Sequence, residues 1–231
     1  MINIPPLDIF ALFWVFICWI GYTLFADREG VKNRNLMTAM REFRQTWMER
    51  MLSRENRMVD VNLMGTLMRS VSLFASTTIF ILAGLLAILG SVDEARAILM
   101  TLPFTVETTR AMWEIKVLLL LVIFVYAFFK FAWSLRQFNY AIVFIGAAPE
   151  AGYESATEKD GFGALASRIT TLAVQSFNRG MRAYYFGLAA LSWFIHPILF
   201  IASSLWVVLV LYRREYHSRT LKSLSNPGED L

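Results

Sequence analysis

Four long apolar stretches constrain this chain more than any other feature of its sequence. They cover residues 7–25, 72–90, 112–134 and 184–211. A helix needs about 20 apolar residues to cross about 30 Å of hydrocarbon, and all four stretches have about this length or more. The composition agrees, because 57% of the residues are hydrophobic and only 17% are charged, which is not the balance of a soluble domain. The sequence therefore predicts an all-α membrane protein with four transmembrane helices, forming a single membrane domain over residues 1–231.

The basic residues between these stretches predict the orientation of the chain. Residues 91–111 contain two basic residues, whereas residues 135–183 contain Arg136, Lys159, Arg168, Arg179 and Arg182. The richest segment is 27–71, with nine: Arg28, Lys32, Arg34, Arg41, Arg44, Arg50, Arg54, Arg57 and Arg69. Because positive loops stay in the cytoplasm, we expect segments 27–71 and 135–183 to be cytoplasmic. With four crossings, both termini are then extracytoplasmic. We expect the protein to lie in the plasma or inner membrane of the cell.

The C-terminal tail conflicts with this orientation. It carries Arg213, Arg214, Arg219 and Lys222, which would then lie outside. A fifth crossing would remove the conflict, and the remaining apolar candidate is residues 138–148. Eleven residues are too short for a span, so we expect a continued or re-entrant helix there.

An amphipathic pattern occupies the first cytoplasmic segment. Leu36, Met40, Phe43, Trp47 and Met51 recur at helical spacing, with charged residues on the other side. Such a helix lies on anionic lipid headgroups, packs against other cytoplasmic elements, or offers a methionine-rich groove to a partner. A second amphipathic element, residues 165–177, leads to the membrane edge. The candidate interaction face consists of Arg41, Phe43, Arg44, Trp47, Arg179 and Arg182.

The polar residues inside the spans form a second candidate site. His196 lies near the middle of the last stretch, next to Pro197, which we expect to kink the helix, and shares a face with Ser192 and Ser203. A histidine at this depth suggests a proton relay, or metal or haem ligation. The alternative is a neutral imidazole that hydrogen-bonds a neighbouring helix and offsets the backbone acceptor that Pro197 frees.

Lys130 is the other member of the candidate intramembrane polar site. It follows the uncharged run 117–129, inside the belt bracketed by Trp113 and Trp133. The lysine either extends its ammonium group to the cytoplasmic interface or contacts a partner or substrate. Both alternatives remain open from the sequence.

Several classes of function find no support in the sequence. Catalytic and nucleotide-binding motifs are missing, so we expect no enzyme activity and no cofactor. The single cysteine, Cys18, excludes an internal disulfide. Glu150, Glu154 and Glu158 have no histidine nearby and are interpreted as solvated surface, not as a metal site. The positive charge follows the predicted topology, and no basic stripe suggests nucleic acid binding.

Three stretches together resemble a known family. They are residues 35–89, residues 130–139 (KFAWSLRQFN) and residues 176–186 (SFNRGMRAYYF), the last followed by Trp193. These resemble the family of bacterial and plant membrane proteins called domain of unknown function 599, over most of the chain. The resemblance implies a helical integral membrane protein and no particular activity. The Arg, Asn and Gln residues beside the span ends are the first place to look for function.

Two functional classes follow from these features. The first is a structural or interaction protein, such as an accessory component of a membrane assembly, with lipid, another membrane protein or a second copy as partner. It is motivated by the amphipathic segment and by a strip of small residues that we expect to face the bundle: Ser72, Ser76, Ala83, Ala87 and Gly90. The alternative is a small-solute or proton transporter or channel that uses Lys130 and His196. Four spans without an internal repeat favour the first class.

Overall fold

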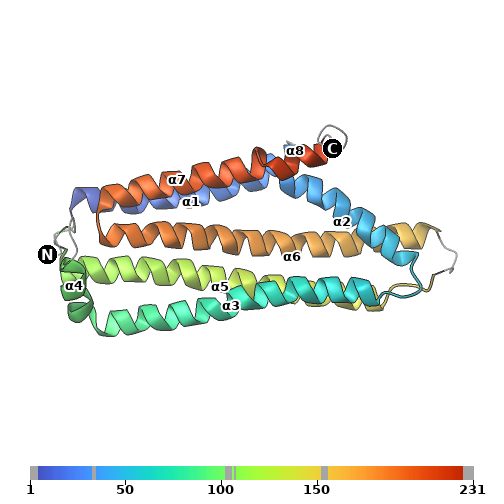
Figure 1. Cartoon of the computed structure of the whole chain (residues 1–231), viewed down its shortest axis with the longest axis horizontal. Coiled ribbons are helices and arrows are strands. Elements are labelled where there is room, and N and C mark those ends of the chain that lie inside the picture. Colours follow the sequence, from blue (N-terminus) through green and yellow to red (C-terminus); the bar gives the residue numbers. More distant parts are fainter. Residues whose placement is uncertain (1–4, 33–34, 102–105, 107, 152–155, 226–231) are drawn as a thin grey trace.

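Helices make up all the regular structure that the computed structural model describes. It describes residues 5–32, 35–101, 106, 108–151 and 156–225, with backbone alone for 29–32, 156–160 and 225. The elements are α1 (Pro6–Lys32), α2 (Leu36–Leu52), α3 (Met58–Gly90), α4 (Val92–Met100), α5 (Arg110–Gly146), α6 (Ala156–Leu191), η1 (Ser192–Phe194), α7 (Pro197–Tyr216) and α8 (Arg219–Ser225). In Figure 1, α1, α3, α5, α6 and α7 run along the long axis of the molecule, and α2 slants from the ends of α1 and α7 toward the N-terminal part of α6.

Four described helices are long and apolar enough to cross a membrane. They cover Pro6–Arg28, Met58–Gly90, Arg110–Gly146 and Pro197–Leu224. The first three contain the predicted spans 7–25, 72–90 and 112–134. Residues 138–146 continue α5 as expected. The prediction of an all-α polytopic membrane protein is therefore confirmed.

The predicted fourth span, residues 184–211, is not a single kinked helix. α6 ends at Leu191, η1 follows, and His196 adopts an extended backbone before α7 begins at Pro197. Proline suits the first turn of a helix because the amide hydrogen that it lacks has no helical acceptor there. The chain therefore reverses direction between α6 and α7 (Figure 1).

This reversal changes where the chain starts and ends relative to the bundle. α1 begins at the end where α4 and the α6–α7 turn lie, whereas α7 runs toward the start of α2 (Figure 1). The predicted placement of both termini on one side depended on a single helix over residues 184–211. Without that helix, the prediction loses its basis.

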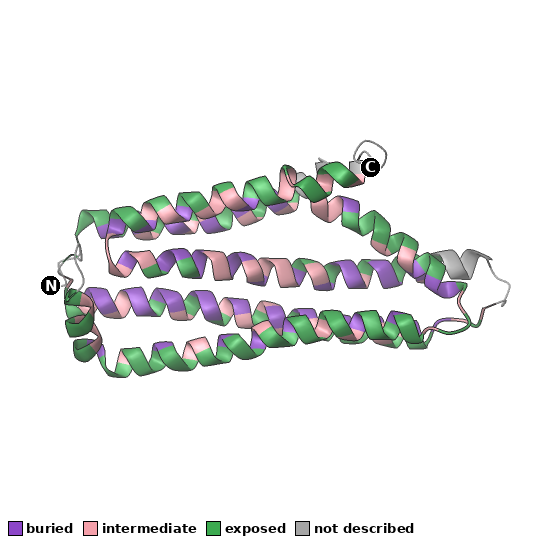
Figure 2. Cartoon of the chain, viewed as in Figure 1, coloured by how far each residue is buried: buried purple, intermediate pink, exposed green. Residues whose placement is uncertain are grey.

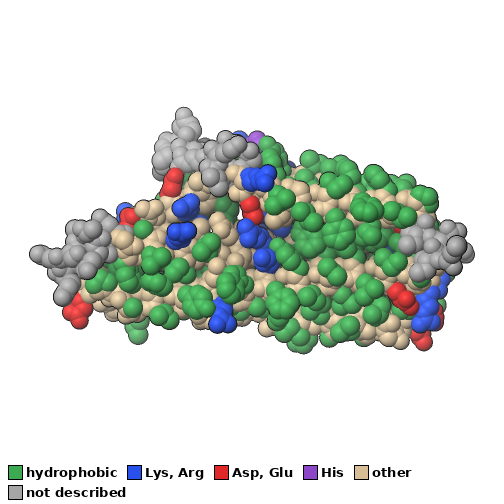
Figure 3. All heavy atoms as spheres, turned by 180° about the vertical axis from the view of Figure 1, so that it is seen from behind, with side chains coloured by type: hydrophobic (Ala, Val, Ile, Leu, Met, Phe, Trp, Pro, Cys, Tyr) green, Lys and Arg blue, Asp and Glu red, His purple; other side chains and the backbone are tan. Residues whose placement is uncertain are grey.

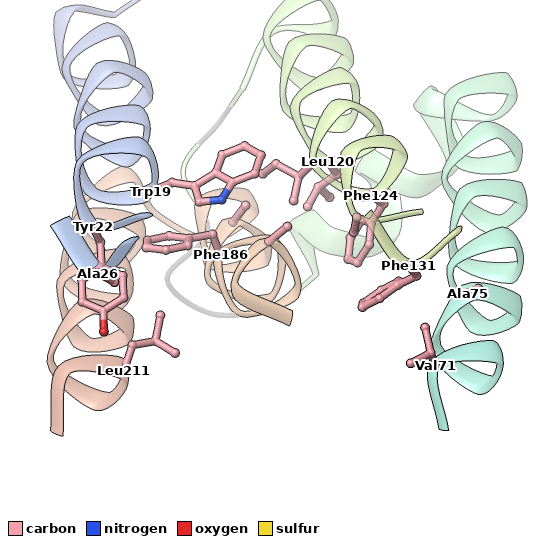
Figure 4. Close-up of a cluster of buried hydrophobic side chains, with 14 of the residues drawn as sticks. Trp19, Tyr22, Ala26, Val71, Ala75, Leu120, Phe124, Phe131, Phe186 and Leu211 are labelled. Carbon is pink, nitrogen blue, oxygen red and sulfur yellow. The ribbon is translucent and has the colours of Figure 1, made fainter. Parts of the chain in front are cut away.

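The closest helix packing in the described bundle joins α5 and α6. A Cβ atom at Gly180 would lie 2.5 Å from Phe131, and one at Gly187 would lie 2.9 Å from Phe124. These glycines let the two aromatic rings pack directly against the α6 backbone. Phe186 is also fully buried, with its ring centroid 6.4 Å from that of Trp19 on α1 (Figure 4). α5 and α6 therefore form the centre of the bundle.

α3 contributes mainly an outer surface. Figure 2 shows long exposed stretches along this helix, and its buried positions include Val71, Ala75, Thr78 and Leu85. The small residues predicted to face the bundle are all exposed: Ser72, Ser76, Ala83, Ala87 and Gly90. That prediction is wrong, because α3 turns the face that holds Val71, Ala75, Thr78 and Leu85 toward its neighbours instead.

Candidate functional site

A groove of about 730 Å³ opens between α2, α6 and the end of α7. Most of the residues that line it are apolar, and four are charged. The lining residues are Leu36, Met37, Met40, Phe43, Arg44, Trp47, Leu67, Val174, Phe177, Asn178, Met181, Arg182, Tyr185, Leu211, Arg214 and Glu215. We call this cavity the α2–α6–α7 groove.

The predicted apolar face of α2 forms one wall of this groove. Leu36, Met40, Phe43 and Trp47 all line it, and Phe43 is 52% exposed. An amphipathic helix normally buries such a face against its neighbours. Of the predicted face, α2 buries Met51, and it also buries Ala39, Met48 and Leu52, so part of its apolar face stays uncovered.

Two contacts hold the C-terminal end of α2 in place. The indole nitrogen of Trp47 donates to a carboxylate oxygen of Asp60 at 2.7 Å, and Arg54 pairs with the same carboxylate. Arg57 donates to the carbonyl oxygens of Ala148 and Pro149 beyond the end of α5. At the other end, the Asn35 side chain accepts from the Thr38 amide at 2.8 Å and caps α2. The wall of the groove is therefore fixed at both ends.

Arg44 crosses from α2 toward α6. Its Nε donates to the Thr171 hydroxyl at 3.2 Å and its Nη2 donates to the Met37 carbonyl at 3.4 Å. No carboxylate pairs with it among the described side chains. Burial lowers the pKa of the Arg44 guanidinium, and the positive charge of Arg41 lowers it further. An arginine remains charged in a protein, so Arg44 keeps a half-buried positive charge that no carboxylate balances in the described part of the chain.

Arg214 supplies the second positive group without a carboxylate partner among the described residues. Its Nη1 donates to the hydroxyl of Tyr185 on α6 at 2.7 Å, and its guanidinium lies 5.9 Å from the centroid of the same ring. Unlike Arg44, this side chain is exposed. The groove thus has one arginine on the α2 side and one on the α7 side for which the described residues supply no carboxylate partner.

Arg182 is neutralised by carboxylates instead. Its Nη2 lies 2.8 Å from Glu215 on α7, and its Nη1 lies 3.1 Å from Asp27 on α1. Arg179 also pairs with Asp27, at 2.8 Å, and Tyr22 donates to Glu215 at 3.0 Å. This network ties α1, α6 and α7 together at one level of the bundle.

A smaller polar pocket of about 150 Å³ lies next to the groove. Both cavities are lined by Met37, Asn178 and Arg182. Its other lining residues are Ala26, Asp27, Asn35, Thr38, Arg41, Thr171 and Gln175. Thr171, the hydroxyl partner of Arg44, therefore belongs to the pocket while Arg44 belongs to the groove.

The structure brings most of the predicted cytoplasmic interaction face together. Phe43, Arg44, Trp47 and Arg182 line the groove, and Arg41 lines the polar pocket. Arg179 lines neither cavity and pairs with Asp27. In Figure 3, Lys and Arg side chains gather in the middle of the visible face, beside a half that is largely hydrophobic.

The predicted intramembrane polar site is divided. Ser192 and Ser203 do meet, with hydroxyl oxygens 2.8 Å apart, because α6 and α7 are antiparallel. His196 caps α7, where its Nδ1 accepts from the Ile198 amide at 3.1 Å. Lys130 lies elsewhere, with its ammonium 5.2 Å from the Tyr126 ring.

The separation of Lys130 from His196 follows from their helices. Phe194, two residues before His196, stacks edge-on against Trp113 with ring centroids 4.8 Å apart. Lys130 lies seventeen residues further along α5 than Trp113, or about 25 Å at 1.5 Å per residue. Neither residue lines the α2–α6–α7 groove or the polar pocket.

Sequence analysis missed a buried polar cluster near the start of α1. Lys116 on α5 donates to the Trp193 carbonyl at 2.9 Å, and its ammonium lies 3.9 Å from Asp8. The Trp193 indole in turn donates to Asp8 at 2.7 Å. Asp8 had the sequence signal of a residue in the first turn of a helix, but nothing in the sequence paired it with Lys116.

The described residues contain no group of three His, Cys, Asp or Glu side chains that would hold a metal ion. Glu154 and the side chain of Glu158, from the predicted solvated row, lie outside the described part of the chain. The described charged groups with defined contacts include the groove arginines, the Asp27–Arg182–Glu215 network and the Asp8–Lys116 cluster.

One comparison with known proteins gives a match. A family model described as "Protein of unknown function, DUF599" matches residues 10–220, which is most of the chain. No curated protein and no solved structure matches. The family match confirms the resemblance drawn from the sequence and adds no activity.

Proposed function

Because the chain belongs to the DUF599 family, whose members have no known function, we propose a role for it from its groove and charges. The protein is an interaction component of the plasma membrane, accessory to a membrane assembly. It holds an anionic phospholipid of the cytoplasmic leaflet in the α2–α6–α7 groove. In this role it is not an enzyme.

The proposed topology has five crossings, with the N-terminus outside and the C-terminus in the cytoplasm. Its fifth crossing is the C-terminal part of α6 with η1 (residues 183–194). This stretch is not among the four helices that are long and apolar enough to cross a membrane alone, and it crosses inside the bundle, where α6 packs against α1, α5 and α7. Each of the five helices carries a basic residue toward the α2 side of the bundle: Arg28, Arg69, Lys130, Arg182 and Arg214. The positive-inside rule supports a cytoplasmic position for all five. The basic tail then lies inside too, and the conflict found in the sequence disappears.

This topology puts the groove at the inner surface of the membrane. From Ser70 to Gly90, α3 has no charged residue over 21 positions, which span about 30 Å. That length matches the hydrocarbon core. Arg69 and the other inner basic residues then lie at the level of the lipid phosphates, and α2 starts from the same level.

The observation that carries the proposal is a pair of unpaired arginines beside an apolar groove. Arg44 and Arg214 lack a carboxylate partner among the described residues, although both line an otherwise mainly apolar cavity. An anionic phospholipid has a matching structure, with an acyl chain for the apolar walls and a phosphate for the guanidinium groups. Basic pockets between membrane helices on the cytoplasmic side bind such headgroups.

No contact in the described structure favours the transporter alternative. His196 uses its Nδ1 to cap α7, and Lys130 lies far from it along α5. A transport site needs its polar groups around one cavity near the middle of the bilayer. We therefore propose no transport activity.

Native mass spectrometry tests the lipid proposal. The purified protein is stripped of lipid, incubated with an equimolar mixture of phosphatidylglycerol and phosphatidylcholine, and examined for bound lipid. We expect one retained phosphatidylglycerol, and a loss of about tenfold or more in the Arg44→Gln/Arg214→Gln variant, since each charged hydrogen bond contributes about 1.5–3 kcal/mol.

The matched control is Arg50→Gln/Arg213→Gln. It removes the same charge from the same two helices, but neither residue lines the groove. The control protein should retain phosphatidylglycerol as the wild type does. If both double variants lose phosphatidylglycerol equally, binding depends on general surface charge, which would contradict a lipid site in the groove.

A further inference from the structure

The polar pocket shares three lining residues with the groove: Met37, Asn178 and Arg182. We infer that the pocket binds a headgroup that carries free hydroxyl groups, so that the preferred ligand is a phospholipid of the phosphatidylglycerol type. This inference rests on the proposed lipid groove. It names the class of lipid that the groove accepts.

The two cavities meet where a lipid headgroup would continue beyond its phosphate. Arg44 lines the groove, and its hydrogen-bond partner Thr171 lines the pocket, 3.2 Å away. Asn178 and Arg182 line both. A phosphate at Arg44 therefore directs its ester substituent into the polar pocket, while the acyl chain stays on the apolar side. The pocket volume of about 150 Å³ has room for several water-sized groups.

The polar wall of the pocket comes from one face of α6. Thr171, Gln175, Asn178 and Arg182 are spaced by four, three and four residues, so that they lie in a row along the helix. Gln175 has no hydrogen-bond partner among the described residues. Within the described structure the Asn178 amide donates to the Met37 sulfur alone, at 2.8 Å, and a thioether is a weak acceptor. Both amides thus have donors and acceptors available for hydroxyl groups.

The charges in the pocket favour a headgroup with hydroxyl groups over the other common phospholipid headgroups. The pocket also contains Arg41 and Arg182, and the one carboxylate among its described lining residues, Asp27, already pairs with Arg179 and Arg182. An ammonium group, as in phosphatidylethanolamine, would meet Arg41 without a free carboxylate. A choline group has no hydrogen to donate to the amides. A headgroup with hydroxyl groups brings no positive charge next to Arg41. It also hydrogen-bonds the amides, because each hydroxyl donates and accepts.

The test compares two lipids of the same charge. Phosphatidylglycerol and phosphatidylethanol each carry a single negative charge, but only the first has free hydroxyl groups. In competition measured by native mass spectrometry, we expect the wild type to prefer phosphatidylglycerol by about fivefold or more, as expected for one or two hydrogen bonds. The Gln175→Leu/Asn178→Leu variant should bind both lipids equally and still reject phosphatidylcholine.

A single substitution in the pocket and a control outside it complete the test. Gln175→Leu alone changes an exposed side chain and should not affect folding. It should reduce the preference for phosphatidylglycerol over phosphatidylethanol by half or more. The control Gln45→Leu/Asn62→Leu removes two exposed amides outside the pocket and should keep the wild-type preference.

The outcomes separate this inference from the proposed function. If the wild type binds the two anionic lipids equally, and Arg44→Gln/Arg214→Gln loses both, the proposal that the groove binds an anionic lipid is supported and the headgroup inference is wrong. If the wild type binds neither lipid better than phosphatidylcholine, the groove itself is wrong, and the inference fails with it.

Discussion

At the scale of single residues, the buried charges near the start of α1 are a sensitive point of the structure. Asp8 and Lys116 are 7% and 3% exposed, and the Trp193 main chain and indole complete their hydrogen bonds. The three residues come from α1, α5 and η1, so the cluster joins separate parts of the bundle. Removing one charge leaves the other buried without compensation.

The first prediction concerns this pair. Asp8→Leu or Lys116→Met alone should destabilise the protein by about 3–5 kcal/mol, which lowers the unfolding midpoint by roughly 10 °C for a chain of this size. The double variant should lose clearly less than the sum of the two single losses. Thermal unfolding in detergent measures all three.

Glu114→Gln is the control for that measurement. Glu114 pairs with Arg110 on the surface, where the Arg110 side chain is 61% exposed, and such pairs contribute about 1 kcal/mol or less. Strictly additive losses in the double variant would contradict the coupling between Asp8 and Lys116.

At the scale of helices, the contact between α5 and α6 depends on glycine. Phe131 and Phe124 lie where the Cβ atoms of Gly180 and Gly187 would be. We predict that Gly180→Ala destabilises the protein by about 1–3 kcal/mol, because the ring or the helix must move. Thermal unfolding in detergent measures the loss.

Gly84→Ala on α3 is the matched control. A Cβ atom there meets nothing within 4 Å, and alanine favours a helix over glycine by about 1 kcal/mol. This variant should unfold at the wild-type temperature or above it. If Gly180→Ala is as stable as Gly84→Ala, the two helices do not pack as closely as described.

At the scale of the whole molecule, the proposed five crossings place the chain's two ends on opposite sides of the membrane. Single cysteines in a Cys18→Ser background test this with a maleimide that does not cross membranes. We expect Ser91→Cys to react in intact cells, and Ser53→Cys and Ser223→Cys to react only after the cells are permeabilised. All three replaced serines are exposed. Labelling of Ser223→Cys in intact cells, with Ser53→Cys still protected, would return the topology to four crossings.

Much of the candidate site was foreseeable from helical spacing. The pattern of Leu36, Met40, Phe43 and Trp47 predicts the face of α2 that lines the groove. The opposing polar row on α6 also has helical spacing, but its importance appears only when α2 packs beside it. Periodicity identifies the face of one helix, whereas a cavity depends on two or more.

The sequence by itself determined that the chain is helical and inserted in a membrane, because about 20 consecutive apolar residues have few other stable environments. It did not determine the path of residues 184–211. Pro197 is compatible with a kink inside a helix and with the first turn of a new one. The tertiary structure decided between them, since α6 is buried against α1 and α5, and α7 turns back to pack on α1. That choice sets the end of the bundle at which α7 ends and forms the third wall of the groove, because burial between helices depends on contacts that local sequence does not encode.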